Sequence, residues 1–447
     1  MQYVVRAILP LLLLALTLPA AASAAPRQRV ETLSLQQALE LAQAQNPEVL
    51  LGRVRQARAE AARLQTQRGV LPTVTADATY LHADLGLLEA PLPEIPGTLP
   101  LAGGVSLDPF EGTILGVQLV QPLVNVGAWH AREQAQLQVE AARTGLGRIS
   151  AEVAVTTIEA YFAAVTAAAQ VEAEAGALAA ARRALAQAEA AHREGLVSRL
   201  DVLNARTRVA EMEARLGSAE ARVIAAESAL QETLGIDDDV SIELTDPVPD
   251  PPLRLAAGEE RLLQRADVRA LQQAVAAAEA GVKRAQAGHL PDVNLFARYQ
   301  RVDLNNPLDY DETDWIVGVT LGWTLFSGFG VAGAVDEAQA DAWRRRIELS
   351  ARQRRVQSEA SDTRAWWQAE LQAWQSATRS ITGAEEAQAL AERRYAEGLN
   401  DMTEVLQAQA SALGARTRAL QARYKAVVAA QRYLLAIGAQ DAGRLTP

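Results

Sequence analysis

The chain repeats its own sequence, and this internal duplication constrains the fold more than any other feature. Three pairs of segments match in the same order along the chain. Chance similarity between alanine-rich helices explains one such match, but not an ordered set of three. The sequence therefore predicts two copies of one structural unit. The matching pairs are VLPTVTADATY (70–80) with HLPDVNLFARY (289–299), GVQLVQPLVNVGA (116–128) with GVTLGWTLFSGFG (318–330), and EGLVSRLDVLNAR (194–206) with EGLNDMTEVLQAQ (397–409).

We expect the first unit to span residues 25–236 and the second to span residues 259–438. Between them, residues 237–258 are rich in proline and aspartate and lack helical periodicity, so we expect an irregular connector there. Residues 439–447 form a short C-terminal tail, of a kind that frays. Within each unit the pattern predicts a helix, a strand, a loop, a second strand, a long helix, a glycine turn and a return helix.

The first 24 residues (1–24) are typical of a secretory signal peptide. Arg6 supplies a positive charge, residues 8–18 form a short apolar run, and residues 22–24 (ASA) match an A-x-A cleavage pattern. The apolar run is too short to cross a bilayer. We therefore expect cleavage after Ala24 and export from the cytoplasm; an uncleaved signal anchor is the alternative.

Composition excludes several classes of function. The chain has no cysteine, which excludes disulfides, thiolate metal sites, cysteine nucleophiles and a lipid-modified N-terminal cysteine. Its formal net charge of −11 argues against a basic surface for nucleic acid, so we expect no nucleic-acid partner. Aromatic residues make up only 4% of the chain although hydrophobic residues make up 49%, so the apolar content is mostly alanine and leucine. This balance is typical of long helices with thin contacts between them.

The spacing of prolines predicts a rod of helical hairpins. Residues 127–194 contain no proline, and as one helix they would extend about 100 Å. The return helix, residues 198–234, would reach only about 55 Å, so another helix has to cover the rest of the long one. In the second unit, too, the predicted return helix is shorter than the long helix, and a short helix has to cover the rest. The predicted hairpins span residues 127–234 and 330–437, and the short helices that complete them span residues 47–70 and 259–289.

Heptad spacing predicts how the return helices pack. The second return helix has mostly alanine where the first has a mixed apolar seam, and alanine lets helices approach closely. A second stripe, with steps of seven from Leu406 to Leu434, runs beside that alanine seam. Two buried stripes require neighbours on two sides, as in the wall of a helical cylinder. The seam of the first return helix is Val202, Ala205, Val209, Met212, Leu216, Ala219, Val223, Ala226 and Leu230.

Four segments alternate between apolar and polar residues with a period of two, which predicts β-strands with one apolar face. Each has the length of a transmembrane strand with aromatic residues near the ends, so we expect the apolar faces to contact lipid. An ordinary sheet packed on a core is the alternative, but no remaining helix has a broad apolar face to cover it. Four strands cannot close a barrel in lipid, so copies of the chain have to associate. The predicted strands span residues 72–82, 113–123, 292–302 and 314–325.

The sequence offers little for an enzyme. The four histidines are scattered without the spacing of metal ligands. The acidic run at residues 237–239 lies in the connector, where we expect it to be solvated. No phosphate-binding glycine loop and no nucleophile motif is present. We therefore predict no catalytic residue, no cofactor and no bound metal.

Each unit carries a glycine turn followed by an apolar residue. Gly195 and Gly398 permit a tight turn between helices, and Leu196 and Leu399 follow them directly. An apolar side chain at a solvated tip indicates a docking surface. We expect a partner protein to bind at both turns.

These features, in this order and duplication, resemble the TolC-type outer-membrane factor family of efflux and secretion channels. The resemblance covers essentially the whole mature chain. It rests on the LSLQQALELAQAQNP opening, the Leu-Pro pair before the first strand of each unit, the QPLVNVG and TLFSGFG segments before the long helices, and the two EGL turns. It implies a mostly α fold with a β-barrel sector. In that fold, four transmembrane strands per protomer join in a trimeric twelve-stranded barrel, continued by a tunnel of long helical hairpins.

The resemblance also implies a location and partners. It places the protein in the outer membrane of a Gram-negative bacterium, in contact with outer-membrane lipid, as a homotrimer that extends into the periplasm. A periplasmic adaptor protein would meet the two turns, and an inner-membrane transporter of RND or ABC type would supply the energy. The implied function is the passive exit duct of a tripartite efflux or type I secretion system. A soluble periplasmic coiled-coil adaptor or structural protein is the alternative.

The resemblance further implies an entrance gate at the turns. Family members often carry acidic residues that ring the aperture on the helix after the second turn. The matching residues here are Glu404 and Gln407, so one expected acid is an amide. Asp401 begins the same helix, and Asp201 and Asn204 occupy the helix after the first turn. If three copies of Glu404 meet near a symmetry axis, their charges favour cations at the mouth.

Overall fold

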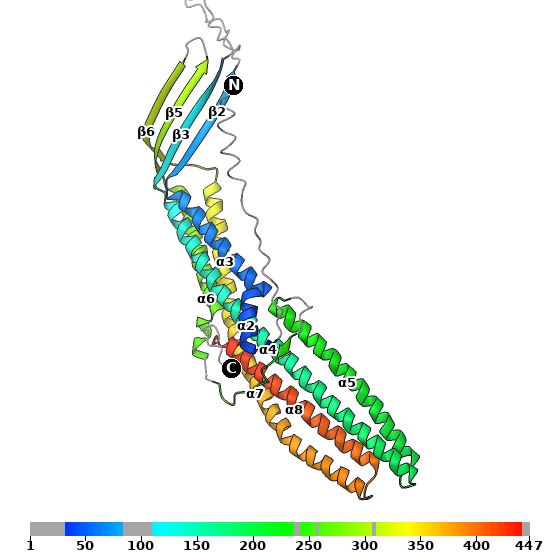
Figure 1. Cartoon of the computed structure of the whole chain (residues 1–447). Coiled ribbons are helices and arrows are strands. Elements are labelled where there is room, and N and C mark those ends of the chain that lie inside the picture. The colour runs from blue at the N-terminus through cyan, green and yellow to red at the C-terminus, as the bar shows by residue number, and fades with distance from the viewer. Residues whose placement is uncertain (1–31, 84–109, 237–241, 256–258, 306–309, 440–447) are drawn as a thin grey trace, which may run out of the picture.

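Figure 1 shows an elongated, mostly helical molecule with a β-sheet at one end and the tips of two helical hairpins at the other. This computed structural model describes residues 32–83, 110–236, 242–255, 259–305 and 310–439. The predicted signal peptide and nearly all of the predicted tail lie outside these residues. Each long strand is joined to a helix along the axis of the molecule. We call the half with the sheet the sheet half and the other the tip half.

One antiparallel sheet contains the four long strands, in the order β2-β3-β5-β6. Its register places apolar residues opposite one another, and Val117 on β3 lies between Ala76 and Tyr299. The other face is polar, and Arg298 on β5 pairs with Asp77 on β2 at 3.8 Å. Within the described residues, β2 and β6 each pair on one side only, so the protomer has an open sheet and no closed barrel. The strands are β2 (Thr73–Ala83), β3 (Phe110–Val124), β5 (Asp292–Asn305) and β6 (Tyr310–Gly322).

The strand ends differ from those expected from the alternation. The strands predicted at 113–123 and 292–302 continue further at the end away from the helices. The strand predicted at 314–325 ends earlier, at Gly322. The alternation continues past that point through Trp323, so the period alone does not reveal where the chain leaves the sheet for the helix.

Two glycines leave room for side chains on the polar face of the sheet. A Cβ on Gly116 would lie 2.9 Å from Oδ1 of Asp77, and a Cβ on Gly318 would lie 2.8 Å from Cζ of Phe296. Real Cβ atoms do not approach other atoms so closely. Asp77 and Phe296 therefore lie over the neighbouring strand, in space that a larger residue would fill.

The long helix of the first unit is covered by two shorter helices placed end to end, as its length predicted (Figure 1). α4 (Val126–Arg193) packs against α3 (Pro47–Thr66) in the sheet half and against α5 (Arg199–Leu234) in the tip half. Asn46 joins the two shorter helices, because its Nδ2 donates to the Thr233 carbonyl (2.7 Å) while its Oδ1 caps α3.

The second unit repeats this plan. α7 (Gly330–Ala396) packs against α6 (Ala266–Gln286) and against α8 (Met402–Ala436). The two units meet along α4, which contacts both α6 and α8. Short 3₁₀ turns, η1 (Gln67–Gly69), η3 (Glu259–Gln264) and η4 (Ala287–His289), lie next to the short helices.

Most residues of the predicted heptad seams are buried. Val202, Ala205 and Met212 on α5 are shielded from solvent, as is most of the alanine seam of α8. Leu413 and Val427, from the second stripe on α8, are buried as well. The reason is that α8 packs against α4 in addition to α7, so the prediction of neighbours on two sides is confirmed for this helix.

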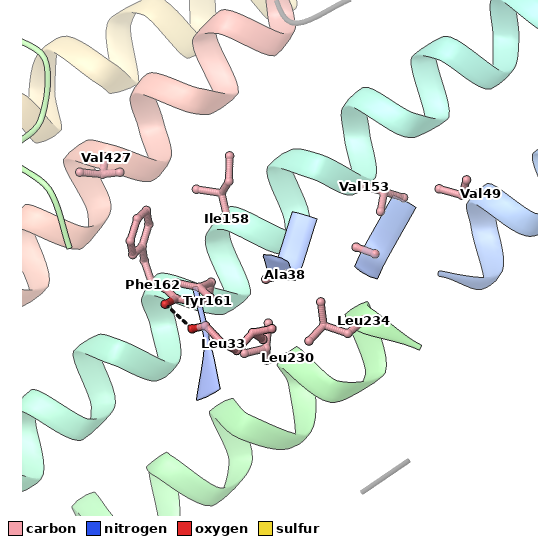
Figure 2. Packing of buried hydrophobic residues seen from close by; sticks show 11 residues of the cluster. Leu33, Ala38, Val49, Val153, Ile158, Tyr161, Phe162, Leu230, Leu234 and Val427 are labelled. Carbon is pink, nitrogen blue, oxygen red and sulfur yellow. Dashed lines mark hydrogen bonds between the residues drawn. The ribbon is translucent and has the colours of Figure 1, made fainter. Parts of the chain in front are cut away.

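The largest apolar cluster lies at the middle of the molecule (Figure 2). Tyr161 on α4 is fully buried there, and its hydroxyl donates to the Leu33 carbonyl (2.9 Å) and accepts from the amide of Asp246 (3.0 Å). α2 (Leu35–Gln45) covers one side of the cluster. The buried members are Leu33, Ala38, Ala42, Val49, Val153, Ile158, Tyr161, Phe162, Leu230, Leu234 and Val427.

The connector predicted to be irregular contains a short strand. β4 (Glu243–Leu244) pairs in parallel with β1 (Thr32–Leu33), which precedes α2. A strand of two residues is too short to show a period, so this pair could not be predicted from the sequence. This pairing holds the segment between the two units against the start of the first unit.

Among the described helices, α4 alone includes an 18-residue window that is long and apolar enough to cross a membrane, with a mean hydropathy of 1.2. Half of that window is buried inside the molecule. A core helix has the same composition, and α4 contributes Tyr161 and Phe162 to the central cluster. The apolar stretch of α4 is thus accounted for by packing.

A cluster of charged side chains holds the C-terminus of α8. The Arg265 side chain is 0% exposed; it donates to the Ala436 carbonyl (2.7 Å) and pairs with Asp267 (2.9 Å) and Glu359 (3.2 Å). Arg352 on α7 pairs with the same two carboxylates. A helix C-terminus carries unpaired carbonyls and partial negative charge, and the buried guanidinium satisfies both. The cluster therefore fixes α6, α7 and α8 relative to one another.

The same cluster sets the ionisation of Asp267. Burial alone would raise the pKa of its carboxyl, but hydrogen bonds from Arg265 and Arg352 and the positive charges of Arg265 and Arg148 hold that pKa below its ordinary value of 3.8. A carboxyl whose pKa is lowered in the folded state stabilises the fold at pH values above its ordinary pKa. That contribution is lost as the pH falls through the lowered pKa.

Replacing Arg265 by methionine is expected to destabilise the protein by about 3–5 kcal/mol, because two carboxylates then lose their buried partner. Arg355→Met is the matched control: the Arg355 side chain is 74% exposed and pairs with Glu359 at the surface, where such a pair contributes about 0–1 kcal/mol. Thermal unfolding in detergent, followed by circular dichroism, measures both. Equal unfolding midpoints for the two variants would contradict the proposed importance of the cluster.

Asp267→Asn is expected to be less stable than the wild type at neutral pH, because it lacks the charge that the two arginines stabilise. The difference should shrink as the pH falls through the lowered pKa of Asp267, since the wild type then loses the charge too. Unfolding midpoints between about pH 7 and about pH 2 measure the trend. Asp362→Asn, at an exposed site on α7, serves as the control. A pH-independent difference for Asp267→Asn would exclude ionisation as the cause.

Candidate functional site

The two hairpins end in turns of the same geometry. φ is 75° at Gly195 and 71° at Gly398, in the left-handed region. The amides of Leu196 and Leu399 donate to the Ala191 and Arg394 carbonyls, at 2.9 and 2.8 Å, while each glycine amide donates to a carbonyl one turn back (3.0 Å). This is the Schellman arrangement, which satisfies carbonyls that a helix end leaves unpaired. The left-handed φ explains why glycine stands at both turns.

An aspartate takes part in the N-terminal cap of each helix that follows a turn. Ser198 caps α5, and Oδ2 of Asp201 accepts from the Ser198 amide (3.0 Å) and hydroxyl (2.7 Å). Asp401 caps α8, and its Oδ1 accepts from the amide of Glu404 (3.0 Å). Two of the five predicted gate residues, Asp201 and Asp401, therefore hold the first turn of a helix, where the helix dipole favours negative charge.

The other three predicted gate residues lie on the same helices. Glu404 and Gln407 are exposed on α8, and Asn204 is partly buried on α5. Within the described part of the chain, no three histidine, aspartate or glutamate side chains lie close enough to hold a metal ion. The acidic residues at the tips are thus spread over two helices, and Glu404 is available to a neighbouring molecule.

An apolar cluster joins the two tips to one another. Tyr395 and Leu406 pack at its edge, and small side chains on α4 let α8 come close. Moving one tip away from the other would expose this cluster to water. Its buried members are Ala184, Ala188, Val202, Ala205, Met402 and Val405.

Sequence reasoning missed two polar groups at the tips. The Tyr395 hydroxyl is buried without a hydrogen-bond partner among the described residues; its pKa is raised by burial and by the negative charge of Asp201. Asn400 donates its Nδ2 to the Ala391 carbonyl (3.2 Å), but its Oδ1 is buried without a partner in the same part of the chain. An unsatisfied buried polar group costs about 1–3 kcal/mol, so these two groups make the packing of the tips less stable. A comparison of the repeats would have identified Tyr395, because it stands where the first repeat has His192.

The two tips differ in their apolar surface. Leu196 is 73% exposed and Leu399 is 62% exposed. On α5 the apolar surface continues along the helix with the exposed Leu200 and Leu203. On α8, Leu406, the counterpart of Leu203, is packed against the tip cluster instead. The first tip is therefore the more apolar of the two.

A small cavity lies between the hairpins, away from the turns. Its volume is about 60 Å³, and alanines and Gly176 of α4 form one wall. Arg208 and Arg416 line it, but they already pair with Glu211 (3.1 Å) and Glu385 (2.7 Å). A cavity this small with its charges already paired does not provide a substrate site.

Comparison with known proteins places this arrangement in a family. A family model described as outer membrane efflux protein matches residues 38–236 and 258–439, which together make up most of the chain. No curated protein sequence matches the chain. Several solved structures of outer-membrane channels share its fold.

The outer-membrane channel OprN is 21% identical with a TM-score of 0.74, over 92% of this chain and 94% of OprN. The outer membrane protein VceC from Vibrio cholerae is 20% identical with a TM-score of 0.74, over 90% of this chain and 96% of VceC. The CmeC outer membrane channel of Campylobacter jejuni is 17% identical with a TM-score of 0.75, over 90% of this chain and 85% of CmeC. These likenesses show the fold, and the family model shows the family. The chain belongs to the outer membrane efflux protein family, and its location is the outer membrane.

Proposed function

We propose that three copies of this chain form a passive exit channel across the outer membrane. The observation that carries the proposal is the four-stranded sheet, which is apolar on one face and unpaired at both edges within the described protomer. An unpaired peptide group in lipid costs several kcal/mol, so the strands have to continue into neighbouring copies. Spanning barrels begin at about eight strands, which requires at least two copies. The resemblance to TolC-type channels supports three copies and twelve strands.

The apolar face of the sheet supports direct contact with lipid. On β6, Trp315 is 75% exposed, and Val317, Val319 and Leu321 are exposed on the same face. Trp323, also exposed, follows directly below the strand. An apolar band with aromatic residues at its ends is typical of strands that face lipid in outer-membrane barrels.

In this channel the helices form a tunnel in the periplasm, and the hairpin tips form its entrance. Asp201, Asn204, Asp401, Glu404 and Gln407 are the residues that we place at the gate. The exposed position of Glu404 supports a ring of three carboxylates, which would favour cations. The Tyr395 hydroxyl, buried without a hydrogen-bond partner among the described residues, supports an entrance that rearranges when it opens.

The channel depends on other proteins for energy and direction. The chain carries no phosphate-binding loop, so a transporter of RND or ABC type in the inner membrane has to drive export, and the chain itself is not an enzyme. We infer that a periplasmic adaptor links the two, in a tripartite efflux or type I secretion system. The exposed Leu196 and Leu399 beside Gly195 and Gly398 support docking of that adaptor.

The channel is tested by extracting the mature protein from outer membranes and adding it to planar bilayers. We expect a detergent-requiring, heat-modifiable trimer that conducts ions and prefers cations. Glu404→Ala should lower the cation-to-anion permeability ratio roughly two- to tenfold, the effect of about 0.4–1.4 kcal/mol of electrostatic energy. Glu397→Ala, in the turn itself, is the matched control and should change the ratio less.

Two results would contradict the proposal at different levels. A soluble monomer in the periplasm would support the coiled-coil protein that the sequence left as an alternative, and would exclude the channel. A conducting trimer whose ratio and pH response are the same in Glu404→Ala would leave the channel standing and exclude Glu404 from the gate.

Adaptor docking is tested with a photo-crosslinking residue placed at position 196 or 399 in cells of the native host. We expect an adduct with a periplasmic protein that mass spectrometry identifies as a helical-hairpin adaptor. Position 253 is the control, because Leu253 is equally exposed but lies in the connector at the middle of the molecule. An adaptor adduct at 253 and none at the tips would place docking elsewhere.

A further inference from the structure

The polar face of the sheet carries a small group of apolar side chains. Phe296 on β5 and Ile316 on β6 interrupt the alternation of their strands, because both stand at positions of the polar face. The register brings them together: Phe296 lies between Val120 on β3 and Gly318 on β6, and Ile316 is its diagonal neighbour. Diagonal neighbours are about 7–8 Å apart, within reach of an aromatic side chain. We call Val120, Phe296 and Ile316 the apolar patch.

The apolar patch presents its surface to the outside of the protomer. A Cβ on Gly318 would lie 2.8 Å from Cζ and 2.9 Å from Cε1 of Phe296, so the ring lies across the backbone of β6. Ile316, beside it, is 54% exposed, and Phe296 and Val120 are half-buried. A ring and a branched aliphatic side chain thus form one continuous apolar surface.

The first unit shows that the sheet does not require a phenylalanine here. Asp77 stands where the second unit has Phe296, and Gly116 stands where it has Gly318. Asp77 lies over Gly116 in the same way as Phe296 lies over Gly318. An aspartate therefore fits this place in the strand pairing. Because burial of apolar surface is favourable, a ring left half-exposed at such a place indicates contact with a molecule outside the sheet.

The surroundings of the apolar patch are polar and charged. The rows on either side of Phe296 contain Asn294 paired with Thr320, and Gln118 paired with Arg298. The Arg298 guanidinium lies 3.8 Å from the Asp77 carboxylate, and both side chains are partly exposed. Covering these groups with lipid chains would cost free energy, because lipid offers them no hydrogen bonds. Apolar surface beside exposed charges of both signs fits a molecule that is itself amphiphilic.

We propose that the apolar patch is a transit site for the ring of a small amphiphilic molecule, with the polar part of that molecule over the Asp77–Arg298 pair. The inference rests on the proposed channel, in which this face lines the lumen and only molecules small enough to pass can reach it. Three copies would place three such sites at one height. Passage requires sites from which a molecule readily leaves, and a patch of three side chains provides a weak one.

The site is tested with two cations that differ by one ring. Benzyltrimethylammonium and tetramethylammonium carry the same charge, so their comparison isolates the contribution of the ring. The full-length mature protein is added to planar bilayers, and each cation is titrated against the channel current. Benzyltrimethylammonium should halve the conductance at a concentration roughly two- to tenfold lower than tetramethylammonium, which is the effect of about one aromatic contact.

Variants locate the effect on the sheet. Phe296→Asn has the shape of the aspartate in the first unit and should bring the ratio of the two concentrations close to one. Ile316→Thr should lower the ratio in part. Ile114→Thr is the matched control: Ile114 is the counterpart of Ile316 on the same face, but its diagonal neighbour is Asp77 and not a ring. This control should leave the ratio unchanged.

Thiol labelling tests what covers the patch, since the chain has no cysteine of its own. In phospholipid vesicles, a water-soluble maleimide should label Ile316→Cys, and benzyltrimethylammonium should slow the labelling more than tetramethylammonium does. Val317→Cys, at an exposed position on the other face of β6, should stay unlabelled.

The outcomes separate the transit site from the channel. If the channel conducts but the ratio is one in the wild type, or is the same in Phe296→Asn, the site is excluded and the channel stands. An equal fall in Ile316→Thr and Ile114→Thr would also exclude it. If the cysteine at position 316 stays unlabelled in a conducting channel, lipid or a second copy covers this face and the site is wrong. A protein that neither inserts nor conducts would overturn the proposed channel as well.

Discussion

Lipid offers no hydrogen-bond partner to a peptide group, and the arrangement of the whole molecule follows from this constraint once its strands lie in the membrane. β2 and β6 each have one edge that nothing in the described protomer pairs. Each strand is joined to a helix, so in the proposed channel the symmetry that closes the sheet would also set the neighbours of the helices. In that proposed assembly, the unpaired edges of the sheet and the outer helices of the protomer would find their partners together.

Stability is distributed unevenly along the molecule. Large buried side chains gather at the middle, around Tyr161 and around the guanidinium of Arg265. Towards the tips, alanines make up half of the buried apolar cluster, and Tyr395 and Asn400 leave polar atoms buried without partners among the described residues. A rigid middle with less stable ends suits a channel whose entrance has to open, since moving elements come from the less stable parts of a protein.

Most of the fold could be predicted because it consists of repeated local patterns. The duplication, the heptad seams and the period-two strands are visible in the sequence, and so are the turn glycines. The pairing of β1 with β4 was missed because two residues show no period. The cluster around Arg265 was missed because Glu359 and Ala436 come from distant parts of the chain, and no spacing rule connects them.

The candidate site was predicted less completely than the fold. The positions of the turns follow from Gly195 and Gly398, but the capping role of Asp201 was overlooked although Ser198 stands three residues before it. Tyr395 carries no motif of its own. A comparison of the repeats marks its position as the counterpart of His192, but the burial and the charge of Asp201 that act on its hydroxyl appear only in three dimensions.

The glycines on the polar face of the sheet bear on what can pass through a ring of such protomers. Asp77 lies over Gly116 and Phe296 lies over Gly318, so neither side chain stands upright from the wall. If that face lines the proposed channel, Asp77 and Phe296 narrow the bore less than they would if they stood upright. A methyl group at Gly116 or Gly318 would push Asp77 or Phe296 toward the axis without changing the strand pairing. In the proposed channel, a single substitution at either glycine would therefore narrow the bore while the strand register stays the same.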